Sequence, residues 1–249
     1  MSNPSMTVAW LTWRQLFANR RLYLALAFSL APVAITLLFK QFSANPANEA
    51  HGFYLTMERE IVVGTLLPIA ALVFGTTAFG GEIDDGTLLY LFVKPIARWR
   101  VVIAKYVVAA LSTCVLMLPA VYLPWLLLRA PELPAGLPFA FIQGAILGGV
   151  LYSALFVLLG LSFRQSLVIG LVYVVGFEGV LTRAVVGFKS LSVREFANTT
   201  TAAVADSTLK LGDPVVSTLT VKVVGAILLF GGLALAVWKL WKYEVAERL

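Results

Sequence analysis

The chain has 249 residues, of which 60% are hydrophobic and 13% are charged. A soluble domain carries roughly 25% charged residues and cannot hide so much apolar surface, so this composition excludes a soluble protein and predicts a membrane protein. In a membrane protein, the net charge of +6 is interpreted first as a signal of orientation in the membrane and not of nucleic-acid binding. A single cysteine, Cys114, and a single histidine, His51, exclude an internal disulfide and a His/Cys metal cluster within one chain.

Six apolar stretches each approach the roughly 20 residues that a helix needs to cross the hydrocarbon core. We therefore predict an all-α membrane protein whose residues 1–249 form a single transmembrane domain. Gly144 and Gly148 in the fourth stretch have the GxxxG spacing that favours close helix packing, with a transport pathway as the alternative. The predicted spans are about 22–39, 61–81, 104–128, 139–163, 166–186 and 219–241.

The segment before the first span predicts an N-terminal interfacial helix over about residues 6–19. Trp10, Trp13, Leu16 and Phe17 recur at helical spacing there, which suits a helix lying at headgroup depth. The alternative is that this segment begins the first transmembrane helix, but Arg20-Arg21 would then fall inside the span.

The distribution of basic residues predicts that both termini are cytoplasmic. With the N-terminus inside, eleven of the nineteen Lys and Arg residues lie on the inner side, as the positive-inside bias requires. Residues near 41–60 and 187–218 then form outer connections, and the second is long enough to fold into small helices.

The connection after the second predicted span, about residues 82–100, is apolar without being long enough to span. Three acidic residues, Glu82, Asp84 and Asp85, stand at its start, where helix N-terminal amides favour negative charge, and Pro95 ends the run. This pattern predicts a short helix parallel to the membrane that needs a groove to sit in. A solvated connector is the alternative, although it would not need Leu88, Leu91 and their apolar neighbours.

The same segment resembles the permease subunits of type-2 ABC exporters. Glu82, Gly86-Thr87-Leu88, Pro95, Arg98 and Lys105 follow that family's pattern, although Ala97 stands where the family usually has Ser. The resemblance implies a coupling helix that docks on a separate ATPase, with a second contact at the turn between the fourth and fifth spans. That turn could instead be a tight turn whose arginine anchors topology. The residues implied in coupling are Glu82, Asp84, Asp85, Gly86, Thr87, Leu88, Leu91, Arg98, Arg164 and Gln165.

The resemblance also implies the partners and the location. Two ABC ATPase subunits would bind ATP and Mg, since none of the eight lysines follows a glycine as a phosphate-binding loop requires, and this chain carries no cofactor of its own. A second permease subunit, the same chain or a related one, would complete an exporter in the bacterial cytoplasmic membrane. The implied contacts include the lipid bilayer but no nucleic acid. A periplasmic accessory protein is a further partner that the sequence neither requires nor excludes.

Three other functions remain open. Glu178 is the single acidic residue in the predicted spans, so it could be the ion site of a secondary transporter, with Arg183 as its partner on the candidate pathway or in a structural pair. A membrane subunit of an ABC-type assembly or maturation complex would use the same coupling loop without transport. An intramembrane hydrolase is the least supported class, because His51 lies outside the spans.

Overall fold

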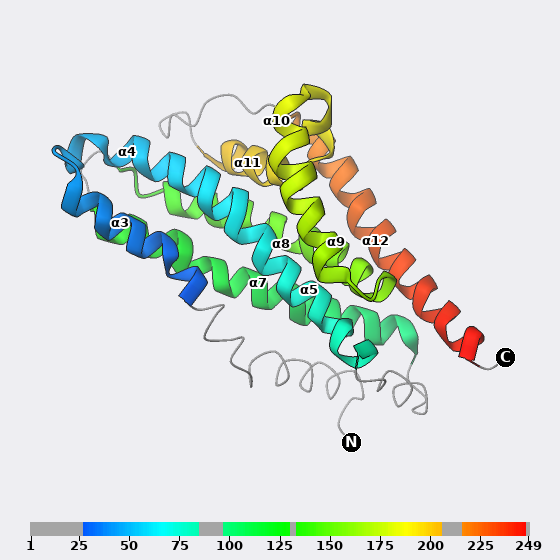
Figure 1. The fold of residues 1–249 in the computed structure, drawn as a ribbon. Helices are drawn as coiled ribbons and strands as arrows, with labels where there is room; N and C mark the ends of the chain where they lie inside the picture. The colour runs from blue at the N-terminus through cyan, green and yellow to red at the C-terminus, as the bar shows by residue number, and fades with distance from the viewer. Residues whose placement is uncertain (1–26, 85–96, 130–132, 206–215, 248–249) are drawn as a thin grey trace, which may run out of the picture.

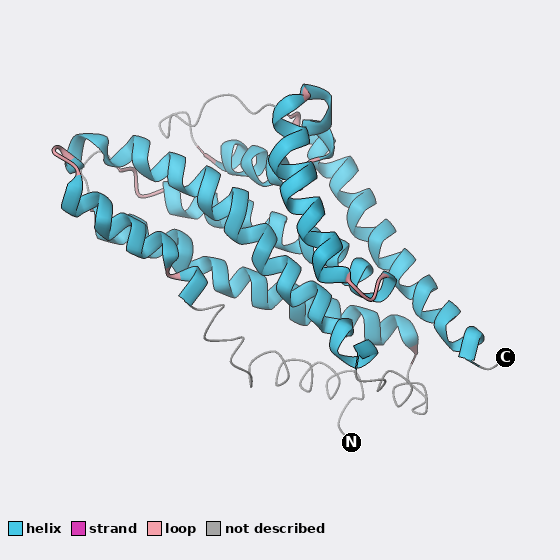
Figure 2. Cartoon of the chain, in the orientation of Figure 1, coloured by secondary structure: helices cyan, strands magenta, loops and turns pink. Residues whose placement is uncertain are grey.

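The computed structural model describes residues 27–84, 97–129, 133–205 and 216–247, and those residues form helices joined by short turns (Figures 1 and 2). No strand occurs among them, which agrees with the predicted all-α class. The interfacial helix predicted at 6–19 lies outside the described residues. The elements are α3 (Ala31–Phe42), α4 (Pro46–Thr56), η1 (Met57–Leu66), α5 (Leu67–Asp84), α7 (Arg98–Leu128), α8 (Leu137–Ser162), α9 (Ser166–Val172), η2 (Tyr173–Leu181), α10 (Thr182–Ala184), η3 (Val186–Leu191), α11 (Val193–Val204) and α12 (Thr218–Glu247).

Within the described residues, four helices are long and apolar enough to cross a membrane. They are Pro46–Gly80, Arg98–Leu128, Leu137–Ser162 and Thr218–Lys242. Two shorter apolar helices, Ala27–Phe42 and Ser166–Leu181, occupy the positions of the first and fifth predicted spans. The chain is therefore a multi-pass helical membrane protein, while the full set of six spans stays a prediction.

The second helix starts earlier than the sequence predicts. Residues near 41–60 were expected in an outer connection, yet α4, η1 and α5 form one helix from Pro46 to Gly80. Proline suits the first turn of a helix, and Pro46 takes that position after Asn45. The charged residues Glu58, Arg59 and Glu60 interrupt the apolar run, but they do not interrupt the helix, because backbone hydrogen bonding does not depend on side-chain polarity.

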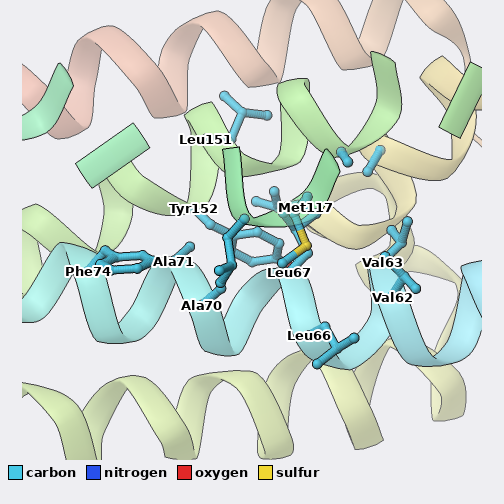
Figure 3. Packing of buried hydrophobic residues seen from close by; sticks show 14 of the residues in the cluster. Val62, Val63, Leu66, Leu67, Ala70, Ala71, Phe74, Met117, Leu151 and Tyr152 are labelled. Carbon is cyan, nitrogen blue, oxygen red and sulfur yellow. The ribbon is translucent and has the colours of Figure 1, made fainter. Parts of the chain in front are cut away.

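Helix α8 forms the centre of the bundle and packs against α5, α7, α11 and α12. Its side chains are apolar all round, as expected for a helix with neighbours on every side. Figure 3 shows Tyr152 of α8 together with Leu67 of α5 and Met117 of α7, which belong to the same hydrophobic cluster. The positions of α5, α7, α11 and α12 therefore depend on their contacts with α8.

The two glycines of the GxxxG motif face α11, and Gly148 also faces Leu67 of α5. A methyl group at Gly144 would lie 2.5 Å from the Ala197 carbonyl oxygen, and one at Gly148 would lie 3.3 Å from the Ala197 side chain. Glycine is needed at Gly144 because the backbone of α11 leaves no room for a side chain. The structure thus supports the packing interpretation of this motif.

The bundle carries its exposed apolar side chains in stripes. On α7 the stripe recurs every three or four residues at Val107, Leu111, Val115, Leu118 and Tyr122. Helix α12 is exposed over most of its surface, since 17% of its apolar window is buried against 61–67% in the other three long helices. Such faces suit contact with lipid, and α12 is the long helix that the bundle covers least.

Candidate functional site

One end of the bundle gathers the last turn of α5, the first turn of α7, the turn after α8 and the end of α12 (Figure 1). We call this the basic end. Among the residues that the structure describes, five side chains at this end are basic, and those of Arg100, Arg164 and Lys242 are exposed. These five residues are Arg98, Arg100, Arg164, Lys239 and Lys242. The segment predicted to couple to an ATPase leaves α5 and returns to α7 here.

Helix α12 joins the two predicted ATPase contacts at the basic end. The guanidinium of Arg98 lies 4.7 Å from the ring centroid of Trp241, which connects the start of α7 to α12. Lys239 Nζ lies 3.4 Å from the Ser162 carbonyl oxygen and 5.6 Å from the ring centroid of Phe163, which connects α12 to the turn after α8. A force on either contact would therefore reach the same helix.

Lys105 connects α7 to α5 one layer deeper. Its side chain is 1% exposed, its ammonium donates a hydrogen bond to the Ala78 carbonyl oxygen, and Nζ lies 4.5 Å from the ring centroid of Phe79. Lys105 is the last residue of the sequence pattern that begins at Glu82, and the structure buries its side chain. One buried cation thus adds a polar contact between the two helices that flank the predicted coupling segment.

We expect Lys105→Met to lower the free energy of unfolding by about 1.5 kcal/mol, because a hydrogen bond from a charged donor is lost while the side-chain volume is kept. Thermal unfolding of the purified chain measures this loss. Lys242→Met removes an exposed ammonium from the same end and should change stability by less than about 0.5 kcal/mol. Equal stability of the two variants would show that the Lys105 contact does not hold α5 to α7.

The remaining predicted coupling residues fall into two groups. Arg164 and Gln165 are exposed in the turn between α8 and α9, so both are accessible to a partner. Glu82 and Asp84 lie in the last turn of α5, and their side chains are not described. The residues that lie outside the described part of the chain are Asp85, Gly86, Thr87, Leu88 and Leu91.

Glu178 belongs to η2 and anchors α11. Its carboxylate is 1% exposed and accepts hydrogen bonds from Tyr173 Oη at 3.2 Å, from the Val193 amide at 3.0 Å and from Ser192 Oγ. Ser192 is the N-cap of α11 and accepts from the Glu195 amide. A carboxylate at a helix N-terminus is favoured by the free amides and by the helix dipole. Arg183 lies in α10, and its side chain is not described.

A second charged contact ties α11 to the first long helix. Arg194 Nη2 lies 2.7 Å from Glu60 Oε1, and its guanidinium occupies the space that a side chain at Gly64 would need. Two positions before Glu60, Glu58 is fully buried, and neither of its carboxylate oxygens has a hydrogen-bond partner among the described residues. The two buried carboxylates, Glu178 and Glu58, therefore lie in very different environments.

The sequence interpretation missed Glu58, Glu60 and Arg194. The prediction relied on uncharged runs, so its second span begins at residue 61, directly after the two glutamates, although Asn45-Pro46 is a recognisable helix start. Arg194 lies within Ser192-Val193-Arg194-Glu195, a Ser-x-x-Glu pattern that signals a helix start. This pattern predicts a helix at the position of α11, but it does not predict that Arg194 pairs with Glu60.

The fold, with its basic end and the polar contacts that hold α11, defines a helical membrane protein built around one central helix. Sequence comparison then identifies the family: residues 18–188 match the ABC-2 family transporter protein. The match covers more than half of the chain, and the chain belongs to this family, as the type-2 ABC permease resemblance predicts. It is therefore a membrane component of a transporter. No curated protein is a significant match to the sequence.

Proposed function

We propose that the chain is the permease subunit of an ATP-binding-cassette exporter in the bacterial cytoplasmic membrane. A separate ATPase subunit, present in two copies, would bind ATP and Mg and hydrolyse ATP at the basic end. A second permease subunit, most simply another copy of this chain, would complete the transport unit. The observation that carries the proposal, together with the family, is that α12 contacts both the start of α7 and the turn after α8.

The proposed coupling follows the contacts of the bundle. Movement of the segment between α5 and α7 would be transmitted to both helices, because Lys105 holds them together. Helix α8 packs against both, so it would respond to either one. At the far side α8 contacts α11 through Gly144, which extends the path to the opposite end of the molecule. Densely packed helices transmit such displacements because they have little free volume to absorb them.

The test begins with the tagged full-length chain and the ATPase that co-purifies with it. Glu82→Arg combined with Gly86→Pro should reduce the recovered ATPase by about tenfold or more, because the substitutions reverse a charge and remove an amide donor within the docking segment. Membrane insertion and the melting midpoint should not change. If the double variant still recovers a fully coupled ATPase, the assignment of this segment is wrong.

A second arm tests the turn after α8. Arg164→Glu should weaken ATPase recovery if the turn is a docking contact, because the exposed arginine would then face the partner. Arg129→Glu is the matched control, since it reverses an exposed charge at the opposite end of α7. Equal recovery with both variants would assign Arg164 to topology alone. ATP hydrolysis that no transported compound stimulates would favour the assembly role over export.

A further inference from the structure

A cavity of about 380 Å³ lies between α8, α11 and α12. This volume falls within the range of roughly 300–1,000 Å³ that is typical of ligand pockets. Leu147 and Leu151 of α8, Ala203 of α11, and Gly225 and Leu229 of α12 belong to its walls. Thr200 also lines it, but its hydroxyl donates to the Phe196 carbonyl oxygen of its own helix at 2.8 Å. The cavity therefore presents a mainly apolar lining.

The cavity exists because α12 has a glycine where it faces α8. A methyl group at Gly225 would meet Leu151 Cδ1 at 3.6 Å, an ordinary contact distance, so a side chain would fit there. Phe230 and Lys222 also line the cavity, and both are exposed, which places its mouth on the outer surface of α12. An apolar molecule could enter from the side of the bundle.

The position of Lys222 sets the depth of this mouth in the bilayer. Lys222 and Lys239 are separated by 17 residues of α12, or about 25 Å at 1.5 Å per residue, close to the thickness of the hydrocarbon core. Lys239 has Trp238 and Trp241 beside it, which is typical of a membrane interface. Lys222 is then at the opposite headgroup level, and Leu229 lies about 10 Å deeper in the hydrocarbon.

From this geometry we propose that the cavity binds one acyl chain of an anionic phospholipid, with the phosphate of the headgroup at Lys222. An acyl chain matches the apolar walls and reaches the cavity through the surface that faces the bilayer. The ammonium of Lys222 favours a net negative headgroup over a zwitterionic one. The bound chain fills the space between α11 and α12 and so supports α11, which the contacts of Glu178 and Arg194 hold from its other end. This site does not depend on the proposed coupling to an ATPase.

Photocrosslinking of the full-length chain in phosphatidylcholine nanodiscs tests the site. The probe is phosphatidylglycerol with a diazirine in one acyl chain, and labelled peptides are mapped by mass spectrometry. Residues of the cavity, such as Ala203 and Leu229, should be labelled several-fold more than Leu111 and Val115 of the exposed α7 stripe. Labelling of the cavity and the stripe in proportion to exposure alone would overturn the proposal.

Two glycine variants in the same helix provide the matched comparison. Gly225→Leu fills the cavity and should reduce cavity labelling by about tenfold. Excluding two methylene groups of the acyl chain from the cavity is enough to weaken binding by that factor. Gly231→Leu introduces the same side chain where nothing lies within 4 Å, and labelling should not change. If Gly225→Leu lowers the melting midpoint, Leu229→Trp fills the cavity from the same helix without altering a glycine. Unchanged labelling in both filling variants would exclude an acyl-chain site.

A separate experiment tests whether Lys222 binds the anionic headgroup. Lys222→Gln should lower phosphatidylglycerol labelling about fivefold, the factor that corresponds to roughly 1 kcal/mol per lysine at an anionic surface. Labelling by the matching phosphatidylcholine probe should not change, and Lys242→Gln at the other interface should affect neither lipid. Equal labelling by the two lipids in the unaltered chain would overturn the preference for an anionic headgroup.

Discussion

Gly144→Ala should lower the free energy of unfolding by about 2–3 kcal/mol, the upper part of the usual cost of overpacking. The added methyl group would lie 2.5 Å from the Ala197 carbonyl oxygen and would also meet Thr201 Oγ1. Thr201 cannot easily turn away, because its hydroxyl donates to the same carbonyl at 3.0 Å. Helix α11 would therefore have to move away from α8.

The single cysteine allows a direct measurement of this effect. Cys114 is partly buried, so a thiol-reactive fluorophore reports unfolding as the temperature rises. We expect the melting midpoint of Gly144→Ala to fall by roughly 4–12 °C, at about 2–4 °C per kcal/mol for a chain of this size.

Gly231→Ala is the control for Gly144→Ala and should act in the opposite direction. Nothing lies within 4 Å of a methyl group at Gly231, so only helix propensity changes, and alanine is favoured by about 0.5–1 kcal/mol. Adding Thr201→Ala to Gly144→Ala should restore part of the lost stability, since one of the two obstructions is removed. A Gly144→Ala variant as stable as the unaltered chain would show that α11 is not held against α8 at this point.

Glu178→Leu should lower the free energy of unfolding by about 3 kcal/mol or more. Tyr173 Oη, Ser192 Oγ and the Val193 amide would all lose their acceptor, and each buried donor left unpaired costs about 1–3 kcal/mol. Glu178→Gln retains one carbonyl oxygen for the Val193 amide, so its loss should be smaller. The same thermal assay measures both variants.

The opposite result is expected for the other buried glutamate. Glu58→Leu removes a carboxyl group that has no hydrogen-bond partner in the described part of the chain, so it should leave stability unchanged or raise it by about 1–3 kcal/mol. The same chemical change at Glu58 and Glu178 thus has opposite expected signs. Strong destabilisation by Glu58→Leu would mean that this carboxylate has a partner outside the described part of the chain.

Glu178 also separates two of the functions that the sequence leaves open. In an ion-coupled carrier, Glu178→Gln abolishes transport, because the residue must bind and release a cation. In the proposed ABC permease it weakens the anchor of α11 and leaves ATP-driven transport in place. The three hydrogen bonds that the carboxylate accepts support the anchoring role.

The composition and the local patterns predicted much of the fold. The long uncharged runs led to α7, α8 and α12, because a segment that lies in hydrocarbon must be apolar and must satisfy its own backbone. The motif around Glu82 predicted the family, and residues 18–188 match it. The start of the second helix was missed because a rule based on uncharged residues cannot recognise a helix that carries Glu58 and Glu60 near its outer part.

The sequence by itself determined that this is a helical membrane protein of the ABC-2 family, since hydropathy and short motifs are properties of neighbouring residues. Only the tertiary structure decided what Glu178, Gly144 and Arg194 contact. Glu178 meets Val193 across 15 positions, and Arg194 meets Glu60 across a far longer stretch of chain. Such partners are chosen by how helices pack around α8, and a linear pattern of apolar and charged residues does not encode which faces meet.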